Sequence, residues 1–400
     1  MRILQLCHKV PYPPSDGGSI AMNQITQALL KKGIEVKVLA LAPTGTMEQP
    51  EKIPGSYAKA TQIELFPIDT RVKPWPAFIN LFTRSSYNIS RFYCKTLASR
   101  LGKLLTEERF DIIQLEGLYL TPYIPFIRQH TGSPILFRSH NIEHFIWERL
   151  AHTATNKLKK AYLTFLARRL RAYEMKTVHQ VDGLIAISPV DMRFFEKNGF
   201  AQPGITIPVA VDPRYFNPAN ASVDNNTVFH IGSMDWRPNQ DGVTWFLDNV
   251  WPLVVEKNPG LRFVLAGKNI AEGFYQYAGS NVTVAGRVPD AAAFMHGNEL
   301  MVVPLLSGGG MRVKIIEAMS AGKAIVSTSI GAEGINCTHG ENILLADTAE
   351  EMAETILHCF RNRNEMQKIG NSARIFASQN HDMENTMEKL IAFYETFLIS

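Results

Sequence analysis

The chain has 400 residues, a formal net charge of +4 at pH 7 and a hydrophobic fraction of 46%. This length exceeds one ordinary core and fits two domains of similar size, and the composition excludes disordered and fibrous proteins. No apolar run approaches the roughly 20 residues that a membrane-spanning helix needs. The four cysteines are scattered without C-x-x-C spacing, so neither a zinc site nor a redox pair is expected, and a reducing cytoplasm is the natural compartment.

The N-terminal region predicts a doubly wound α/β unit. An apolar run over 2–7 is expected to be a buried strand rather than part of a signal peptide. A loop ending in Gly17 and Gly18 follows, then an amphipathic helix over about 20–32 and a strand over 35–42. A dinucleotide-binding fold would need an acidic residue for the ribose at the end of the second strand. That end reads ALAP, which argues against nicotinamide binding.

A histidine follows one of the next strands in the chain. Strands are expected over 111–114 and 135–138, and the second is followed by the segment SHNIEH. His140 therefore stands at the carboxyl end of a strand, where open α/β sheets place their ligands. A lone histidine is more often structural, but this position favours a functional role. Glu143 and His144 are weaker candidates.

Two segments of the first half are strongly basic. Residues 71–100 contain six lysines and arginines with no acidic residue, and residues 149–176 contain eight against one glutamate. Aromatic side chains lie among these cations, as on surfaces that meet lipid headgroups. We expect contact of both segments with an anionic membrane; the alternative is a set of helices packed on the sheet with solvated cations. Nucleic acid is not expected, because no finger, winged or stacking motif accompanies the charge.

A proline-rich segment over 213–218 predicts a domain boundary. We expect a first domain over 1–210, a second over 211–380, and a terminal helix over 381–400. The elements expected in the first domain before this boundary are two strands and a helix, over 181–187, 205–209 and 191–198. Those expected in the second are strands over 228–232, 261–267, 282–286 and 342–346 and a helix over 349–361.

The stretch over 301–328 shows the strongest signals for a ligand site. An apolar strand over 301–306 leads into Gly308, Gly309 and Gly310, where the backbone can take positive φ and approach a ligand closely. A helix over 311–321 is expected next, ended by Gly322, before a strand over 324–328.

This helix N-terminus is a candidate phosphate site. Its unpaired N–H groups and partial positive charge would face whatever lies above the sheet. Arg312 and Lys314 add two cations to the first turn, where the helix dipole disfavours them unless an anion is bound. Glu317 falls on the same face as Gly310 and Lys314, and could accept hydrogen bonds from ribose hydroxyls. The alternative is a surface helix on which Lys314 and Glu317 form an i,i+3 ion pair.

The segment GGGMRVKIIEAMSAGKAIVSTSIGAEGI resembles the donor-binding signature of family-4 retaining glycosyltransferases, and in particular a branch with a GGG-x-R-x-K loop. The resemblance implies an α/β GT-B fold: two Rossmann-like doubly wound domains facing a central cleft, with the C-terminal helix crossing back to the first domain. It also implies that the first domain binds the acceptor and the second binds a nucleotide-sugar donor. The family usually has two glutamates eight positions apart; Glu317 matches the second, and Gly309 replaces the first.

The resemblance extends to individual residues. It implies a catalytic role for His140, near the transferred sugar, and for Arg312, Lys314 and Glu317, which would meet the diphosphate and ribose. Ser233 replaces an arginine common in the family, and Arg237 is expected to compensate for it. The residues that it implies in donor binding are Gly17, Gly18, Gly232, Arg237, Gly286, Val288, Gly308, Gly309, Gly310 and Met311.

The resemblance thus implies transfer of a sugar from a UDP- or GDP-linked donor to an acceptor hydroxyl with retention of configuration. No cofactor is expected, and no D-x-D motif is present, so catalysis is expected to need no metal. The acceptor would be a glycan or a lipid-linked molecule in cell-surface polysaccharide or glycolipid assembly, at the inner face of the cell membrane. A nucleotide-sugar epimerase of the same fold, or an inactive nucleotide-sugar-binding protein, are the alternatives.

Overall fold

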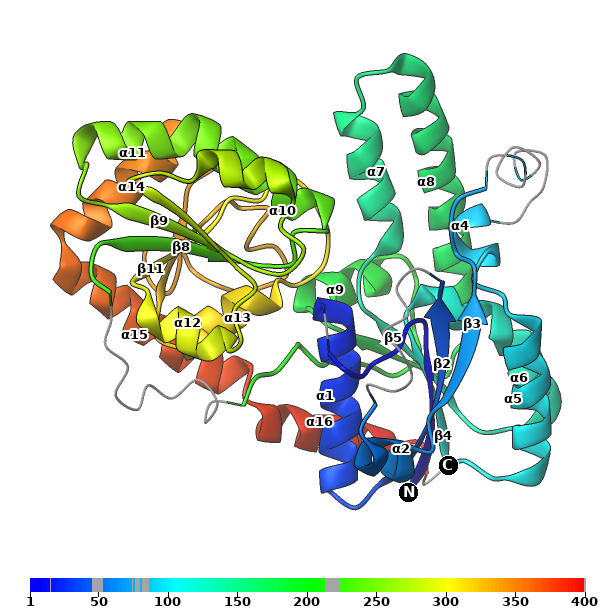
Figure 1. Cartoon of the computed structure of the whole chain (residues 1–400). Helices are drawn as coiled ribbons and strands as arrows, with labels where there is room; N and C mark the ends of the chain where they lie inside the picture. The colour runs from blue at the N-terminus through cyan, green and yellow to red at the C-terminus, as the bar shows by residue number, and fades with distance from the viewer. Residues whose placement is uncertain are drawn as a thin grey trace. The chain divides into compact units, whose positions relative to one another are not determined.

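The computed structural model describes residues 1–14, 16–44, 53–73, 75, 80, 86–212 and 224–398. The chain divides into two compact units. The first comprises Met1–Pro208 together with Glu384–Ser400, and the second comprises Val209–Met383. Each unit is a parallel sheet with helices on both faces (Figure 1). The proline-rich segment 213–218 lies outside the described residues.

The first unit contains a parallel sheet of order β3-β2-β1-β4-β5-β6-β7 among the residues that are described. Its strands are β1 (Arg2–Cys7), β2 (Glu35–Pro43), β3 (Glu64–Ile68), β4 (Ile112–Glu116), β5 (Ile135–Ser139), β6 (Gly183–Ala186) and β7 (Gly204–Thr206). Its helices are α1 (Gly17–Lys31), α2 (Gly55–Thr61), α4 (Tyr87–Ser90), α5 (Lys95–Glu107), α6 (Ile124–His130), α7 (Glu143–Thr153), α8 (Lys157–Val178), α9 (Pro189–Lys197) and α16 (Met383–Glu395), with a 3-10 turn η2 (Leu118–Tyr123).

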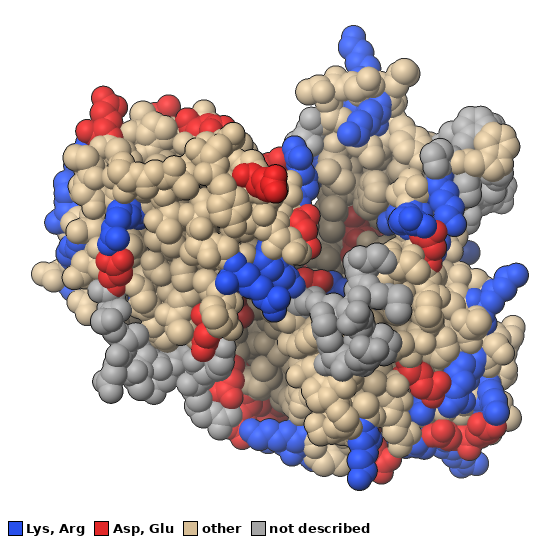
Figure 2. All heavy atoms as spheres, in the orientation of Figure 1, with Lys and Arg blue, Asp and Glu red and all other residues tan. Residues whose placement is uncertain are grey.

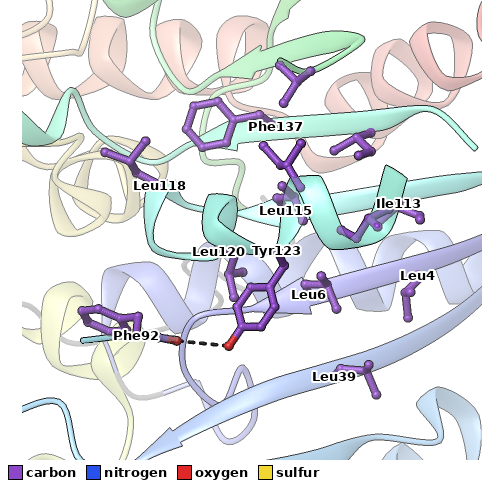
Figure 3. Packing of buried hydrophobic residues seen from close by; sticks show 14 of the residues in the cluster. Leu4, Leu6, Leu39, Phe92, Ile113, Leu115, Leu118, Leu120, Tyr123 and Phe137 are labelled. Atoms are coloured by element: carbon purple, nitrogen blue, oxygen red, sulfur yellow. Dashed lines mark hydrogen bonds between the residues drawn. The ribbon is translucent and has the colours of Figure 1, made fainter. Parts of the chain in front are cut away.

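The core of the first unit lies between the sheet and the helices α5 and α6. Leucines of β1 and β4 pack there because central parallel strands are covered on both faces and need apolar side chains on both. The Tyr123 hydroxyl accepts from the Cys94 N–H at 2.7 Å. It donates to the Phe92 carbonyl at 3.1 Å, the bond drawn in Figure 3. This buried tyrosine connects the segment before α5 to η2, the turn that follows β4.

The helix α1 begins three residues earlier than the sequence predicted. Asp16 caps it: the Asp16 carboxylate accepts from the Ser19 N–H and the Ser19 hydroxyl accepts from the Asp16 N–H, both at 2.9 Å. This reciprocal capping box makes Asp16 the boundary. The prediction that Gly17 and Gly18 belong to the preceding loop was therefore wrong, because both lie in the first turn of α1.

The second unit contains a parallel sheet of order β10-β9-β8-β11-β12-β13 within the described part of the chain. Its strands are β8 (Thr227–Ile231), β9 (Arg262–Ala266), β10 (Val282–Gly286), β11 (Leu300–Val303), β12 (Ala324–Ser327) and β13 (Leu344–Leu345). Its helices are α10 (Arg237–Trp245), α11 (Trp251–Lys257), α12 (Ala291–Gly297), α13 (Val313–Ser320), α14 (Ala349–Arg361) and α15 (Arg363–Asn380), with a π-helical turn η3 (Phe246–Val250) and a 3-10 turn η4 (Glu272–Tyr277). In Figure 1, α10, α11 and α14 cover one face of this sheet and α12, α13 and α15 the other.

The strand order reverses between β1 and β4 in the first unit and between β8 and β11 in the second. Both sheets are therefore doubly wound, and the predicted fold class is confirmed. Open α/β sheets bind ligands outside the carboxyl ends of the strands at such a reversal. The α16 helix belongs to the first unit, where the Tyr394 hydroxyl donates to the Gln114 side chain of β4.

Several predicted boundaries differ from the structure. The strand expected over 301–306 ends at Val303, and the helix expected from 311 begins at Val313. The α15 helix was not predicted. Within the described ranges, no helix is both long and apolar enough to cross a membrane.

Candidate functional site

The glycine loop after β11 brings the strongest candidates together in the second unit. Gly308 and Gly310 have φ of 114° and 77°, which side chains rarely adopt. A Cβ at Gly308 would also lie 2.9 Å from the Trp236 ring. Backbone conformation therefore favours glycine at positions 308 and 310, and the indole of Trp236 restricts position 308 further.

Arg312 fastens this loop. It is the N-cap of α13, is 5% exposed, and its Nη1 donates to the carbonyls of Gly309 and Gly310. Its guanidinium carbon lies 5.3 Å from the centroid of the Trp236 ring. The prediction that Arg312 lies in the first helical turn was wrong, because its backbone is extended and its side chain holds the loop carbonyls.

Lys314 lies in the first turn of α13, with its ammonium between two neutral groups. Its Nζ is 2.8 Å from Asn239 Oδ1 and 3.1 Å from His230 Nε2. Burial, and to a smaller extent the nearby Arg312 charge, lower the pKa of Lys314 to about 7. Lys314, on the helix that follows β11, thus contacts a residue of β8, where the strand order reverses. Its contact with a phosphate stays a prediction.

Glu317 lies one turn further along α13 and is half-buried. Burial raises the pKa of its carboxyl to about 7, and the Lys314 charge opposes that shift. Lys314 bonds Asn239 and His230, so the surface helix with a solvated Lys314–Glu317 ion pair is not the arrangement found. The ribose role of Glu317 stays a prediction.

The other donor-binding candidates lie around the same edge of the second sheet. Gly232 follows β8, and Gly286 ends β10 with a φ of 71°. Val288 is half-buried and Met311 is 9% exposed. Arg237 opens α10 with a side chain that is 79% exposed, and its Nε is 2.8 Å from Asp241. It also lines a shallow cavity of about 360 Å³ with Trp245 and Asp248. Arg237 therefore pairs with Asp241. Lys314, in contrast, lies between His230 and Asn239, where the strand order reverses.

A buried polar network lies at the carboxyl end of β4 in the first unit. Glu116 is fully buried, and its carboxylate is 2.7 Å from His140 Nε2 and 3.1 Å from Arg138 Nη1. Burial would raise the pKa of Glu116, but the Arg138 charge and the bond from His140 lower it to about 2. Burial lowers the pKa of His140. A neutral His140 therefore donates from Nε2 to a charged Glu116.

His8 is a second histidine at this place. It follows β1, and its Nδ1 is 2.6 Å from the Glu116 carbonyl. Since a carbonyl only accepts, Nδ1 carries the proton and Nε2 keeps a lone pair. The His8 ring lies 5.6 Å from Tyr119 and 5.7 Å from His140 between centroids. A Cβ at Gly117 would lie 3.0 Å from His8 Nδ1, so glycine leaves room for the ring.

Glu143 and His144, the weaker candidates, lie at the start of α7. Glu143 accepts a hydrogen bond from the Tyr119 hydroxyl at 2.8 Å, and burial raises its pKa to about 7. His144 Nδ1 is 2.6 Å from the buried Glu174 carboxylate, which also accepts from the Glu143 N–H. Glu143 therefore belongs to the polar edge of the sheet, while His144 anchors α7 to α8.

Gly17 and Gly18 begin α1 in the same unit. Lys9 Nζ is 2.6 Å from Asp16 Oδ1, and a Cβ at Gly18 would lie 2.8 Å from that ammonium. Gly18 thus makes room for an ion pair at the helix start, and donor contact of Gly17 and Gly18 stays a prediction.

Sequence reasoning missed His8, Glu116, His230 and Asn239. The signal that could have found His8 and Glu116 is their position at or just after the end of a strand, which His140 shares. The strand order was also needed, because it alone shows that β1 neighbours β4 and that β8 neighbours β11.

Comparisons with known proteins agree with this architecture. An uncharacterized 44.6 kDa protein in the cps region of Klebsiella pneumoniae is 26% identical over 302 residues, covering 73% of this chain and 76% of that protein. A phosphatidyl-myo-inositol mannosyltransferase of Mycobacterium tuberculosis is 29% identical over 191 residues, covering 45% of this chain and 48% of that protein.

Two solved structures share the fold. Sucrose-phosphate synthase from Thermosynechococcus elongatus has a TM-score of 0.74 and 15% identity, with 100% of both chains covered. HepE of Anabaena in complex with UDP-glucose has a TM-score of 0.65 and 15% identity, covering 99% of this chain and 100% of that one. At this identity the likeness shows the GT-B fold.

Two family models match, and together they cover both units. The model for glycosyl transferases group 1 matches residues 225–362, around the glycine loop. The model for glycosyltransferase family 4 matches residues 15–215, which is half of the chain. The chain therefore belongs to glycosyltransferase family 4 and is a glycosyltransferase with two Rossmann-like domains.

Proposed function

We propose that this glycosyltransferase moves a sugar from a UDP- or GDP-linked donor to an acceptor hydroxyl, with retention of anomeric configuration and without a metal ion. The observation that carries the proposal is the position of the Lys314 ammonium. Lys314 follows the Gly308–Gly310 loop in the chain and contacts His230 of β8, where the order of the second sheet reverses. A diphosphate at this place would meet a cation and a loop of backbone N–H groups. The HepE structure with UDP-glucose supports a UDP-linked donor.

The transfer reaction requires the protein to stabilise a leaving diphosphate. As the bond from the anomeric carbon to the diphosphate breaks, its electron pair and negative charge pass to the phosphate oxygen. Lys314 and the loop N–H groups would stabilise that charge, while Arg312 keeps the loop in shape. Charge-assisted hydrogen bonds contribute about 1.5 to 3 kcal/mol each. Two such bonds to the leaving phosphate would therefore accelerate the reaction by a factor of roughly 10² to 10⁴.

The nucleoside would extend from this point across the carboxyl edge of the second sheet. Glu317 would accept hydrogen bonds from the ribose hydroxyls, and the backbone at Gly286 and Val288 would contact the base. For retention, the acceptor hydroxyl would attack from the face that the diphosphate leaves, and its proton would pass to the leaving phosphate oxygen. No base from the protein is needed in this scheme.

The first unit would receive the acceptor. Burial lowers the pKa of both His8 and His140, so both rings are neutral. They place hydrogen-bonding groups at the carboxyl ends of β1 and β5, as sugar hydroxyls require. A lipid-linked or glycan acceptor is supported by the matches to a phosphatidyl-myo-inositol mannosyltransferase and to a protein of a cps region. The reaction would then take place in the cytoplasm at the inner face of the membrane.

The α7–α8 hairpin of the first unit would contact that membrane. Leu158, at its turn, is 84% exposed and stands between Lys157 and Lys159. Figure 2 shows Lys and Arg side chains at this end of the hairpin. In the other basic segment, 71–100, Trp75 is 71% exposed, while residues 74, 76–79 and 81–85 lie outside the described residues.

The test is a calorimetric titration with UDP and with GDP, each with magnesium and with chelator, repeated on Lys314→Ala. We expect one nucleotide to bind with micromolar affinity, equally with and without magnesium, and the variant to bind it at least tenfold more weakly. Absence of binding, or binding that requires magnesium, would contradict the proposed donor site.

A second experiment separates transfer from the alternatives. The protein is incubated with UDP-glucose, UDP-galactose or GDP-mannose, with and without a membrane extract as acceptor source, and products are separated by mass and chromatography. Transfer releases nucleoside diphosphate only with acceptor, and we expect this result. Conversion of one sugar nucleotide into another without acceptor would indicate an epimerase, and binding without turnover an inactive binding protein.

A further inference from the structure

The ammonium of Lys314 is held by residues from two other elements. His230 is the fourth residue of β8 and Asn239 lies in the first turn of α10. Their Nε2 and Oδ1 atoms are 3.1 and 2.8 Å from Lys314 Nζ. Neither residue was among the site residues that the sequence indicated.

Both acceptors are fixed by backbone carbonyls. His230 Nδ1 is 2.9 Å from the Val302 carbonyl, so Nδ1 carries the proton and Nε2 presents its lone pair to Lys314. Burial lowers the pKa of His230 well below its ordinary value, which keeps the ring neutral. Asn239 Nδ2 donates to the Ser233 carbonyl at 2.8 Å, which turns Oδ1 toward Lys314.

Gly232 leaves the space in which this arrangement forms. A Cβ at this position would lie 2.9 Å from Lys314 Nζ, 2.9 Å from Asn239 Nδ2 and 3.3 Å from His230 Nε2. The three polar groups therefore close around a position that only glycine can occupy without moving them. If Lys314 made only a chance contact at the surface, a glycine at position 232 would not be required.

The groups that face Lys314 give its charge little compensation. His230 and Asn239 are neutral, and Arg312 is a like charge that disfavours the ammonium. Glu317 is the one facing acid that acts on it among the described residues, and burial raises the pKa of that carboxyl to about 7. Burial lowers the pKa of Lys314 itself to about 7. An anion placed next to this amine would favour its protonated form.

We propose that His230 and Asn239 are positioning residues that hold Lys314 for the donor diphosphate, and that a nucleoside diphosphate binds with uptake of one proton by the Lys314 amine. The proton is given up by the acid form of the buffer in solution, so one bond to hydrogen breaks in the buffer as the N–H bond of Lys314 forms, and no bond of the nucleotide changes. This inference rests on the proposed function, because it requires the diphosphate to lie beside Lys314.

The test is calorimetric titration with UDP and GDP at pH 8 in HEPES, Tricine and Tris, which differ in ionisation enthalpy. At this pH the diphosphate and most of the Glu317 carboxyl are already ionised, so the proton must go to Lys314. The dependence of the measured heat on the buffer gives the number of protons taken up. We expect about one proton per nucleotide for the unchanged protein.

Two variants assign that proton. Lys314→Arg keeps a charge that does not titrate in this range, so nucleotide should bind with uptake near zero. Asn239→Asp replaces a neutral acceptor with a carboxylate of the same shape, which would keep Lys314 protonated beforehand. Nucleotide should then bind about tenfold more weakly, with uptake near zero. Full uptake in either variant would overturn the assignment.

His230 is tested by affinity. His230→Leu removes the acceptor and should weaken nucleotide binding about tenfold, whereas His230→Gln, which can still accept a hydrogen bond, should stay within about threefold. Equal affinities in these variants would contradict the positioning role of His230. Nucleotide binding by the unchanged protein without proton uptake would overturn this inference and leave the donor site intact. If neither UDP nor GDP bound, the proposed function would fail and the inference with it.

Discussion

At the scale of single residues, Glu317 gives the most direct test of donor recognition. Its carboxyl lies on α13 one turn from Lys314 and carries the predicted contact with ribose. Glu317→Ala should lower donor-dependent kcat/KM by an amount equivalent to about 2 to 4 kcal/mol, because two ribose hydroxyls would lose their acceptor. Steady-state kinetics with the donor that the experiments under Proposed function identify measures this loss. An unchanged kcat/KM would remove the ribose contact from the proposal.

Glu116 is a residue through which the stability of the first unit should depend on pH. The pKa of its carboxyl is lowered to about 2 in the folded protein, against an ordinary value of 4.5. A lowered acid pKa contributes stability above the unfolded value and loses it as pH falls toward the folded value. The contribution of Glu116, about 3 kcal/mol, should therefore be present at pH 7 and disappear between about pH 4.5 and 2.

The corresponding variant is Glu116→Gln, which keeps the shape but leaves Arg138 buried without its carboxylate. We expect a loss of about 3 to 5 kcal/mol in unfolding free energy at pH 7. Urea unfolding at pH 7 and pH 3 measures it, and the difference from the unchanged protein should shrink at pH 3. Glu107→Gln, at an exposed i,i+4 pair with Lys103, is the control and should change little. A difference independent of pH would show that the Glu116 charge is not the cause.

At the scale of elements, the packing of α15 depends on a glycine in its interior. A Cβ at Gly370 would lie 2.3 Å from the Gly322 carbonyl and 3.2 Å from the Ala324 N–H. Gly370→Ala should destabilise the second unit by about 1 to 3 kcal/mol, because α15 would have to move away from the turn between α13 and β12.

Gly297→Ala is a matched control for this substitution. Gly297 ends α12, and a Cβ there would meet nothing within 4 Å. This variant should leave stability unchanged or raise it by up to about 1 kcal/mol, since alanine reduces the entropy of the unfolded chain. Both are compared by urea unfolding. Equal effects at the two positions would rule out the close contact at Gly370.

The elements also show how far the sequence could predict the fold. The strand over 2–7 was predicted with its observed bounds, because a short apolar run between polar residues has few other interpretations. The start of α13 was misplaced because the Arg312 side chain bonds the loop carbonyls, which no propensity reports. The α15 helix was missed although Met366, Ile369 and Ala373 show helical spacing, since glycine in its middle weakens that signal.

The candidate site was predictable only in part, for a reason of topology. Lys314, Glu317 and the glycine loop are close in the chain, so their spacing was informative. His230 and Lys314 are 84 residues apart, and His8 and Glu116 are 108 apart. His8 and Glu116 meet because β1 neighbours β4. Lys314, on the helix that follows β11, meets His230 because β11 neighbours β8. Without that order, His230 reads as an ordinary core residue.

At the scale of the whole molecule, the proposed membrane contact can be measured directly. The protein is sedimented with vesicles of phosphatidylcholine alone or mixed with phosphatidylglycerol. We expect binding to the anionic vesicles that weakens with added salt, because each cation near such a surface contributes about 1 kcal/mol. Equal sedimentation with both kinds of vesicle would contradict an electrostatic contact.

Variants locate the contact on the α7–α8 hairpin. Leu158→Ser and Lys159→Glu should each reduce binding to the anionic vesicles, the first by removing exposed apolar area and the second by reversing a charge. Lys389→Glu makes the same charge change on α16, at an exposed position, and is the control. If the Lys159 and Lys389 variants lost binding equally, net charge rather than the hairpin would be responsible.

The glycines that follow β8 and β9 also limit how this enzyme can evolve. A Cβ at Gly267 would lie 1.8 Å from the Gly232 carbonyl, and Gly232 itself faces the Lys314 ammonium. No side chain can enter at either position without displacing backbone atoms or the Lys314 ammonium. A lineage that changes its nucleotide or sugar would therefore have to mutate elsewhere, for instance around Val288 after β10. Libraries that seek new donor specificity should leave positions 232 and 267 unchanged.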